Sequence, residues 1–251
     1  AAGTGGFVIN GQCAWDGSGV SVSAAGDVNG DGLADVIVGA DLADPAAGTN
    51  AGRSYVVFGQ SSGGAIELSA VSAGRGGFVI EGQCSADRGG ISVSAAGDIN
   101  GDGLADLVVG AYASDPTTGT EAGRSYVIFG RTGSAPVRLS AVAAGSGGFA
   151  IQGGCAIDGS AASISAAGDV NGDGLADLSV GSRMGDAAAA TWPGRSLGWR
   201  RHCRHHRHSY PTAAAATSAT ASPTHRHRHP DRTGPGPRPG PGPRSDPKCG
   251  P

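Results

Sequence analysis

Lysine and histidine are absent from the first 196 residues of this 251-residue chain, so that region lacks the most common general bases. All 7 histidines lie between residues 202 and 229, which excludes a Ser-His-Asp or Cys-His set from the first 196 residues. Carboxylates are plentiful, but no pair outside the repeated loops described below suggests a glycosidase cleft. We therefore predict that the chain is not an enzyme.

Long apolar runs are also missing. No stretch of 18 or more apolar residues occurs, so we expect no membrane-spanning helix. The chain starts Ala-Ala-Gly-Thr-Gly-Gly, and no signal peptide is visible. Aromatic residues make up only 5% of the chain, whereas glycine accounts for 47 residues. So much glycine without a collagen period indicates many turns between short strands.

A repeat with a period of 71 residues runs through residues 1–196 without insertions. Each repeat contains four segments typical of strands, 20–23, 35–39, 54–59 and 77–80 in the first copy, and no convincing helical period. The positions that recur include Phe7, Phe78 and Phe149; Cys13, Cys84 and Cys155; Asp27, Asp98 and Asp169; and Arg53, Arg124 and Arg195.

Tandem units of four short strands are typical of β-propeller blades, which bury their faces against one another. We therefore predict an all-β fold, a partial β-propeller of two full blades and part of a third over residues 1–196. The rest of the propeller would come from further blades in the full-length chain or from another subunit.

An acidic loop, Asp-Val-Asn-Gly-Asp-Gly-Leu-Ala-Asp, links the first two strands of every repeat, with Ile99 replacing valine in the second copy. Side-chain oxygens stand at positions 1, 3, 5 and 9, and the leucine at position 7 can offer its backbone carbonyl. The candidate metal ligands are Asp27, Asn29, Asp31, Leu33 and Asp35; Asp98, Asn100, Asp102, Leu104 and Asp106; and Asp169, Asn171, Asp173, Leu175 and Asp177.

This ligand set consists of oxygen alone and is rich in carboxylate, which suits Ca²⁺ better than the strict octahedron of Mg²⁺. No Cys or His lies in the loop, which argues against zinc. An EF-hand needs a carboxylate at position 12, where this chain has Val38, Val109 and Val180. We expect about one Ca²⁺ per repeat, three in total. The alternative is a plain Asp/Asn/Gly turn that binds nothing.

At these residues the sequence resembles the FG-GAP repeats of the integrin alpha-subunit N-terminal β-propeller. Residues 19–27, 35–40 and 52–59 are similar to the strands around the calcium loop of that family, and the resemblance covers residues 1–196. The family's Gly-Ala-Pro motif lacks its proline here, since Asp41, Tyr112 and Arg183 stand in its place. The near-identity of the copies favours a bacterial-type array.

The resemblance implies a secreted or cell-surface location and a calcium-stabilised role in protein binding, cell adhesion or scaffolding. The partner would be an extracellular protein or glycan, with no nucleic acid for the repeat body. The loop from Asp44 to Gly52 is a candidate binding surface. The alternatives are an accessory module of a secreted enzyme, phospholipase-like or another hydrolase, whose catalytic domain lies elsewhere, and a truncated product that does not fold.

Two further sets of repeated residues have structural interpretations. Cys13, Cys84 and Cys155 occupy equivalent places on successive blades, too far apart for disulfides between them, so we expect small buried thiols. A metal site or a bridge is the alternative. Arg53, Arg124 and Arg195 are expected to form ion pairs with Asp44, Asp115 and Asp186, which hold the long loop of each repeat.

The tail, residues 197–251, breaks the repeat after Ser196. Residues 1–196 hold 8 Arg against 19 Asp and Glu, a net charge of −11, whereas the tail holds 10 Arg and Lys against 2 Asp, a net charge of +8. Its His/Arg runs and Gly-Pro stretches cannot form a packed core. The tail is interpreted as the product of a reading-frame shift, with a disordered metal- or polyanion-binding tail and a cell-wall linker as the alternatives.

Overall fold

The first two repeats fold into antiparallel four-stranded sheets in a computed structural model that describes residues 6–61, 63–170, 172, 176–184 and 215–219. The first blade has the strand order β2-β3-β4-β6 and the second β7-β8-β9-β11. Their bounds are Ser21–Gly26 (β2), Asp35–Ala40 (β3), Arg53–Val57 (β4), Gly77–Glu81 (β6), Ser92–Gly97 (β7), Asp106–Ala111 (β8), Arg124–Ile128 (β9) and Gly148–Gln152 (β11). The predicted all-β propeller segment is confirmed.

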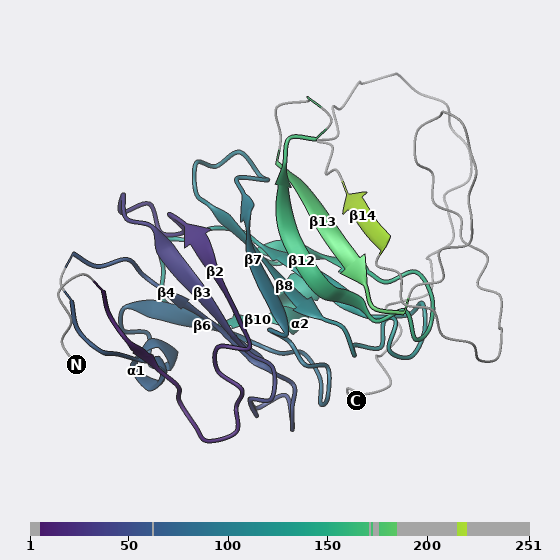
Figure 1. Ribbon diagram of the computed structural model, residues 1–251, viewed down its shortest axis with the longest axis horizontal. Coiled ribbons are helices and arrows are strands. Elements are labelled where there is room, and N and C mark those ends of the chain that lie inside the picture. The colour runs from purple at the N-terminus through teal and green to yellow at the C-terminus, as the bar shows by residue number, and fades with distance from the viewer. Residues whose placement is uncertain (1–5, 62, 171, 173–175, 185–214, 220–251) are drawn as a thin grey trace, which may run out of the picture.

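The second strand of each blade is buried on both faces, as its run of β-branched residues predicts. In β8 all six residues are buried. The innermost strand instead alternates small and apolar residues, and the inner strands of successive blades lie side by side (Figure 1). The amide of Val93 donates to the hydroxyl of Ser21 at 3.1 Å, and that of Ile164 donates to Ser92 at 2.9 Å. The blades therefore stack as an open arc.

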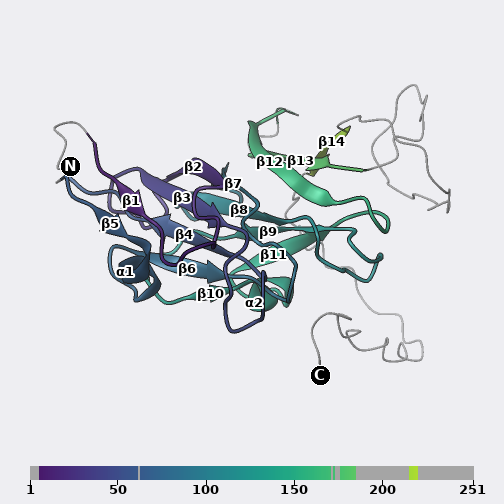
Figure 2. The same cartoon turned by 60° about the horizontal axis from the view of Figure 1, so that its bottom comes forward.

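The linking segments contain short elements that the sequence did not indicate. The strands β1 (Ile9–Asn10) and β5 (Ile66–Glu67) pair in parallel, and β10 (Val137–Arg138) pairs in parallel with β6. The helices α1 (Leu68–Ser72) and α2 (Leu139–Ala143) follow β5 and β10. Neither helix has a side-chain cap, so the helices depend on burial of two apolar residues each, such as Leu68 and Val71 in α1. Figure 2 shows both helices on one side of the array.

The largest apolar cluster lies between the first and second blades. It joins Ile37, Val56 and Phe78 of the first blade to Val93 and Tyr126 of the second. A separate cluster between the second and third blades includes Val108, Val127 and Ile164. The sheets are held together mainly by apolar side chains from both, as expected for units that cannot fold alone.

Two glycines with positive φ angles allow the next blade to approach the inner strand closely. Gly26 has φ of 77°, and a Cβ placed there would lie 2.6 Å from the Cβ of Ala105. Gly97 has φ of 75°, and a Cβ placed there would lie 2.7 Å from the Cβ of Ala176. A side chain at either glycine would be strained by the backbone and would collide with the neighbouring blade. Glycine is therefore needed at both blade junctions.

The third blade differs from the other two in its outer part. The strands β12 (Ser160–Gly168) and β13 (Asp177–Ser182) follow the repeat, but the next strand is β14 (Ala215–Ala219) from the tail. Ala215 pairs with Ser182, as Arg53 pairs with Ala40 in the first blade. The sequence did not indicate this strand. Arg195, which should begin it, and the remaining tail lie outside the described residues.

Candidate functional site

The acidic loops project from one rim, where each inner strand turns into the second strand of its blade. They lie between β2 and β3, between β7 and β8, and between β12 and β13. The first two loops are described completely, whereas Asn171, Asp173 and Leu175 of the third lie outside the described residues. Because the inner strands run side by side, the loops of the first two blades lie next to each other on this rim (Figure 1).

Each loop wraps around the carboxylate of its first aspartate. Asp27 accepts hydrogen bonds from the amides of Gly30, Asp31 and Gly32 at 2.7, 3.1 and 2.8 Å. The second loop repeats the three bonds on Asp98 at 2.7, 3.1 and 2.9 Å. In the third loop, the amide of Gly172 donates to Asp169 at 2.7 Å. Positive φ angles of 78° at Gly30 and 85° at Gly32 permit this tight curl.

The middle of the loop is ordered by its own polar side chains. The Asn29 oxygen accepts from the amide of Asp31 at 2.8 Å, and an Asp31 oxygen accepts from the amide of Leu33 at 2.8 Å. The Asn29 side-chain nitrogen donates to the other Asp31 oxygen at 2.9 Å. The second loop has the same three bonds at 2.9, 2.9 and 2.8 Å. The sequence therefore dictates the same conformation twice.

The last aspartate of each loop is buried, and in the first two loops it links two segments of the chain. The Asp35 carboxylate is 1% exposed and accepts from the amide of Val28 at 2.9 Å and from that of Gly59 at 2.8 Å. Asp106 is bound in the same way by Ile99 and Gly130 at 2.8 Å each. The bonds to Gly59 and Gly130, beyond the third strand of each blade, could not be read from the loop sequence.

Burial raises the pKa of Asp35 and of Asp106 above the usual range of a carboxyl group. Backbone amides oppose this rise, whereas the charge of Asp31 adds to it at Asp35, and so does that of Asp27. The carboxylates of one loop therefore repel one another. Among the described residues, no arginine pairs with the loop carboxylates of the first two blades. Their charge is offset only by amide dipoles.

The donor set fits Ca²⁺ in chemistry and number. An ionised carboxylate offers about four lone-pair positions, so the three amides on Asp27 and the two on Asp35 leave room for a cation. The side chains, however, face the amides of their own loop. In the part of the chain that the structure describes, no three His, Cys, Asp or Glu side chains converge into a metal-holding group.

The repeated arginines contact the backbone of the long loop. The Arg53 guanidinium donates to the carbonyl of Asp44 at 3.4 Å, while the Asp44 carboxylate accepts from the amide of Asn50 at 2.7 Å. Arg124 and Asp115 repeat the arginine-to-carbonyl bond at 3.4 Å. In the first blade these two residues hold the Asp44-to-Gly52 loop through main-chain groups, and not through the predicted ion pair. Arg195 and Asp186 lie outside the described residues.

The equivalent cysteines have different states. Cys84 and Cys155 are disulfide-bonded, whereas Cys13 is a free and exposed thiol. The prediction of three buried free thiols is therefore wrong. The prediction considered only disulfides between equivalent cysteines on successive blades. It could not exclude disulfides with cysteines elsewhere in the chain.

The residues that replace the proline of the Gly-Ala-Pro motif contact a neighbouring repeat. Asp41 forms an ion pair with Arg88 at 3.2 Å. The guanidinium of Arg183 lies over the ring of Tyr112, 5.5 Å from its centroid. These contacts are on the rim opposite the acidic loops. The sequence identified the substitution but did not indicate its partners.

Stacked four-stranded sheets that each carry an acidic loop at one rim define a protein of the β-propeller repeat class. The family model described as FG-GAP repeat matches residues 18–57, 89–128 and 161–196, and so includes the inner strand and acidic loop of every blade. The chain therefore belongs to the FG-GAP repeat family, with integrin alpha-like repeats.

The chain is similar to integrin alpha subunits. Integrin alpha-4 of Xenopus laevis is 30% identical over 172 residues, which cover 68% of this chain. Integrin alpha-E of Mus musculus is 36% identical over 104 residues (38% of this chain), and integrin alpha pat-2 of Caenorhabditis briggsae is 37% identical over 115 residues (43%). The matches span 15%, 8% and 8% of these relatives. Among the described helices, none is long and apolar enough to cross a membrane.

Proposed function

We propose that this chain is a calcium-binding module of an extracellular β-propeller, with a role in adhesion or scaffolding and no catalytic activity of its own. One observation carries the proposal: a complete oxygen-donor loop is built identically in the first two blades, and no arginine among the described residues pairs with its carboxylates. The similarity to integrin alpha subunits supports an extracellular, protein- or glycan-binding role.

In the first blade, Asp27, Asn29, Asp31 and Asp35, with the carbonyl of Leu33, would hold the ion, and the equivalent residues would do so in the other two. A bound Ca²⁺ supplies positive charge that relieves the repulsion among the three carboxylates. The chain itself fixes the loop, because Asp35 links its start to the segment after β4. The proposed partner surface is the Asp44-to-Gly52 loop on the opposite rim.

The loop also contacts the next blade. The amide of Ala105 donates to the carbonyl of Asp27 at 3.0 Å, and the amide of Arg131 donates to that of Val28 at 2.8 Å. Ordering of the first loop would therefore stabilise the junction between the first and second blades as well as the loop. We infer that calcium acts as a structural ion at the junctions and has no catalytic role.

The test is a calorimetric calcium titration of the full chain, together with thermal melting with and without a chelator. We expect about three sites, and at millimolar calcium each site adds about 1.5–3 kcal/mol to the free energy of unfolding. Asp27→Asn and Asp98→Asn should each remove one site. Glu81→Gln is the matched control, since it removes one negative charge outside the loops and should leave all sites intact.

An absence of binding heat, with the same melting temperature in calcium and in chelator, would refute the calcium proposal. Loss of a site in the Glu81→Gln control would show that net charge, and not the loop, governs binding.

A further inference from the structure

The buried aspartates of the first two acidic loops are joined by a continuous path of hydrogen bonds. The Asp35 carboxylate accepts from the amide of Val28 at 2.9 Å, and the carbonyl of Val28 accepts from the amide of Arg131 at 2.8 Å. The preceding amide, that of Gly130, donates to the Asp106 carboxylate at 2.8 Å. Three hydrogen bonds therefore lead from a ligand of the first proposed calcium site to a ligand of the second.

This path is shielded from water along much of its length. Asp35 is 1% exposed, Val28 and Asp106 are fully buried, and Gly130 and Arg131 are half-buried. A buried polar group that loses its partner cannot replace it with water, so breaking any one of these bonds is costly. A shift of Val28 in the first loop is therefore passed on to the last carboxylate of the second.

A second contact joins the two loops directly. The carbonyl of Asp27, the first residue of the first loop, accepts from the amide of Ala105 at 3.0 Å. Ala105 lies between Leu104 and Asp106, which would supply a carbonyl and a carboxylate to the second site. The Leu104 side chain also packs over Gly30, since a Cβ placed on Gly30 would lie 3.0 Å from its Cδ2 atom. Ala105 thus ties two ligands of the second site to the start of the first loop.

We propose that the first two calcium sites are coupled, so that an ion in either loop raises the calcium affinity of the other. The inference rests on the proposed function and adds a property that independent sites would not have. When the first loop holds an ion, Asp27 and Asp35 are fixed. The carbonyls of Asp27 and Val28 then hold the amides that position the ligands of the second site. The junction is ordered once for both ions, and by linkage the effect is equal in both directions.

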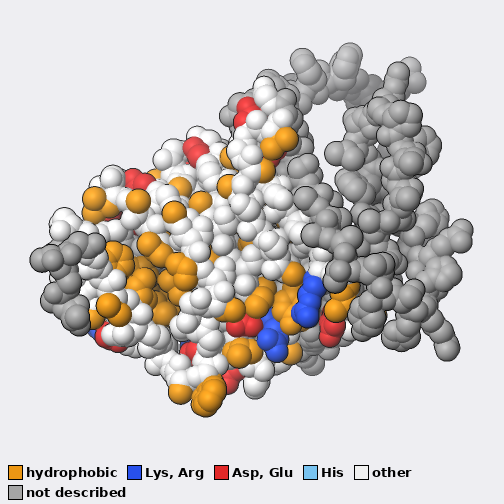
Figure 3. All heavy atoms as spheres, viewed as in Figure 1, with side chains coloured by type: hydrophobic (Ala, Val, Ile, Leu, Met, Phe, Trp, Pro, Cys, Tyr) orange, Lys and Arg blue, Asp and Glu red, His pale blue; other side chains and the backbone are white. Residues whose placement is uncertain are grey.

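Electrostatic repulsion between the ions acts in the opposite direction. Acidic side chains are spaced along the rim that carries the loops, and the arginine side chains visible in the same view lie towards the other rim (Figure 3). An ion in one loop reduces this negative potential and so weakens the attraction of the next ion. Exposed charges are screened beyond about 8 Å at physiological ionic strength, whereas buried hydrogen bonds are not. Coupling through the junction therefore prevails under these conditions.

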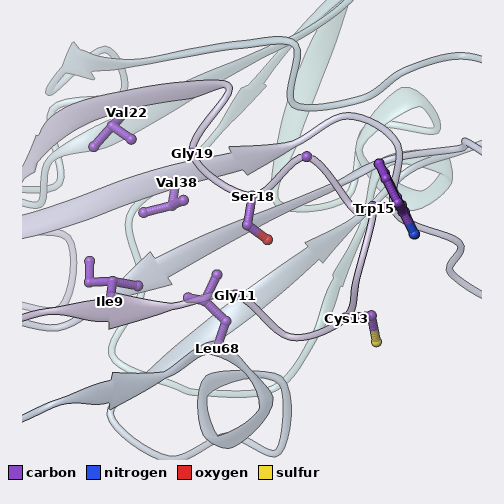
Figure 4. Close-up of a pocket in the computed structure, with 10 residues that line it drawn as sticks. Ile9, Gly11, Cys13, Trp15, Ser18, Gly19, Val22, Val38 and Leu68 are labelled. Atoms are coloured by element: carbon purple, nitrogen blue, oxygen red, sulfur yellow. The ribbon is translucent and has the colours of Figure 1, made fainter.

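The first loop offers a matched control for the leucine contact. Leu33 is the equivalent of Leu104, but it is 40% exposed, and no other acidic loop among the described residues covers it. The side of the first blade that faces away from the second instead contains a hollow of about 410 Å³, lined by residues such as Val22 and Val38 (Figure 4). Leu104→Ala therefore removes a contact between loops, whereas Leu33→Ala removes the same atoms without one.

The test is a calorimetric calcium titration of the full chain in a background that carries Asp169→Asn. This substitution should remove the third site, whose loop is not fully described. Adding Asp27→Asn leaves only the second site, and adding Asp98→Asn leaves only the first. The two single-site dissociation constants predict the curve of independent sites. We expect the two-site chain to bind its second ion about 5- to 20-fold more tightly than that prediction.

Contact variants, each titrated through the same cycle, show whether this excess comes from the junction. Arg131→Pro removes the amide that reaches Val28, and Leu104→Ala removes the leucine contact, so in each the excess should fall below about 2-fold. Arg131→Ala keeps the amide, and Leu33→Ala lies outside the junction, so both controls should retain it. Circular dichroism verifies that every variant is folded.

The outcomes separate this inference from the proposed function. Two sites that bind calcium without excess affinity, or a second ion that binds more weakly than predicted, would overturn the coupling and leave the calcium sites in place. An excess that persists in both Arg131→Pro and Leu104→Ala would overturn it as well. Absence of calcium binding in the unmodified chain would overturn the proposed function and the coupling together.

Discussion

The first and second blades have nearly the same sequence but different surroundings. Val22 of the first blade is 57% exposed, whereas Val93, one period later in the second blade, is 4% exposed, and Leu33 is 40% exposed where Leu104 is half-buried. The residue types are the same in each pair. Burial here is therefore set by position in the stack, and the same side chain contributes to stability only where a neighbouring blade covers it.

The largest expected difference is between aspartate substitutions at two equivalent valines. Val93→Asp should lower the free energy of unfolding by at least about 4 kcal/mol, because it buries an unpaired charge between two sheets. Val22→Asp should change it by no more than about 0.5 kcal/mol, since Val22 is 57% exposed. Denaturant unfolding of dilute, monomeric chains measures both. Equal effects would mean that the first blade is covered in solution.

A smaller difference in stability is expected between alanine substitutions at Gly26 and Gly168, the equivalent glycines of the first and third inner strands. Gly26→Ala and Gly168→Ala share the cost of a left-handed backbone, about 1 kcal/mol. Gly26→Ala adds a collision with Ala105, which should cost about 2 kcal/mol more. Gly168→Ala meets no neighbour and serves as the matched control. If both variants lose the same stability in dilute solution, the second blade moves away from residue 26 at no energetic cost. Packing between the blades would then not require glycine at this position.

Much of the blade could be predicted from the sequence, because its periodicity is local. The 71-residue repeat, the strand pattern and the all-oxygen loop follow from residues close together in the chain. The α1 and α2 helices could not be predicted, since five-residue helices such as Leu68–Ser72 exist only through tertiary burial. Nor could the disulfide-bonded state of Cys84 and Cys155, or the strand β14, which pairs with β13 from a segment distant in sequence.

The candidate site was predictable in composition but not in its contacts. Asp35 was identified as an oxygen donor, yet its buried bond to Gly59 links residues 24 positions apart. Arg53 was expected on the carboxylate of Asp44 but donates to its carbonyl. In both cases a side chain of fixed chemistry meets main-chain groups whose positions are set by packing. Calcium occupancy of the loops stays a prediction.

The smallest expected effect concerns two equivalent tyrosines. Burial raises the pKa of Tyr126, which lies between two sheets, to about 12, and Tyr126 donates to Gln83 at 2.9 Å. Unfolded tyrosine ionises near 10, so the unfolded state loses this proton first and stability falls as pH rises from about 10 to 12. Tyr126→Phe lacks this loss, so its deficit relative to the unmodified chain should shrink by about 1.4 kcal/mol between pH 8 and pH 11.

Tyr55, the equivalent in the first blade, is also fully buried; it donates to Gln12 at 3.0 Å, and burial raises its pKa as well. Among the described residues, no neighbouring blade packs over Tyr55, so the deficit of Tyr55→Phe should shrink less over the same pH range. Thermal melting of the three proteins at both pH values measures the difference. Identical shifts would show that burial within one blade suffices to hold the phenol neutral, whereas a shift confined to Tyr126→Phe would assign the effect to the junction between blades.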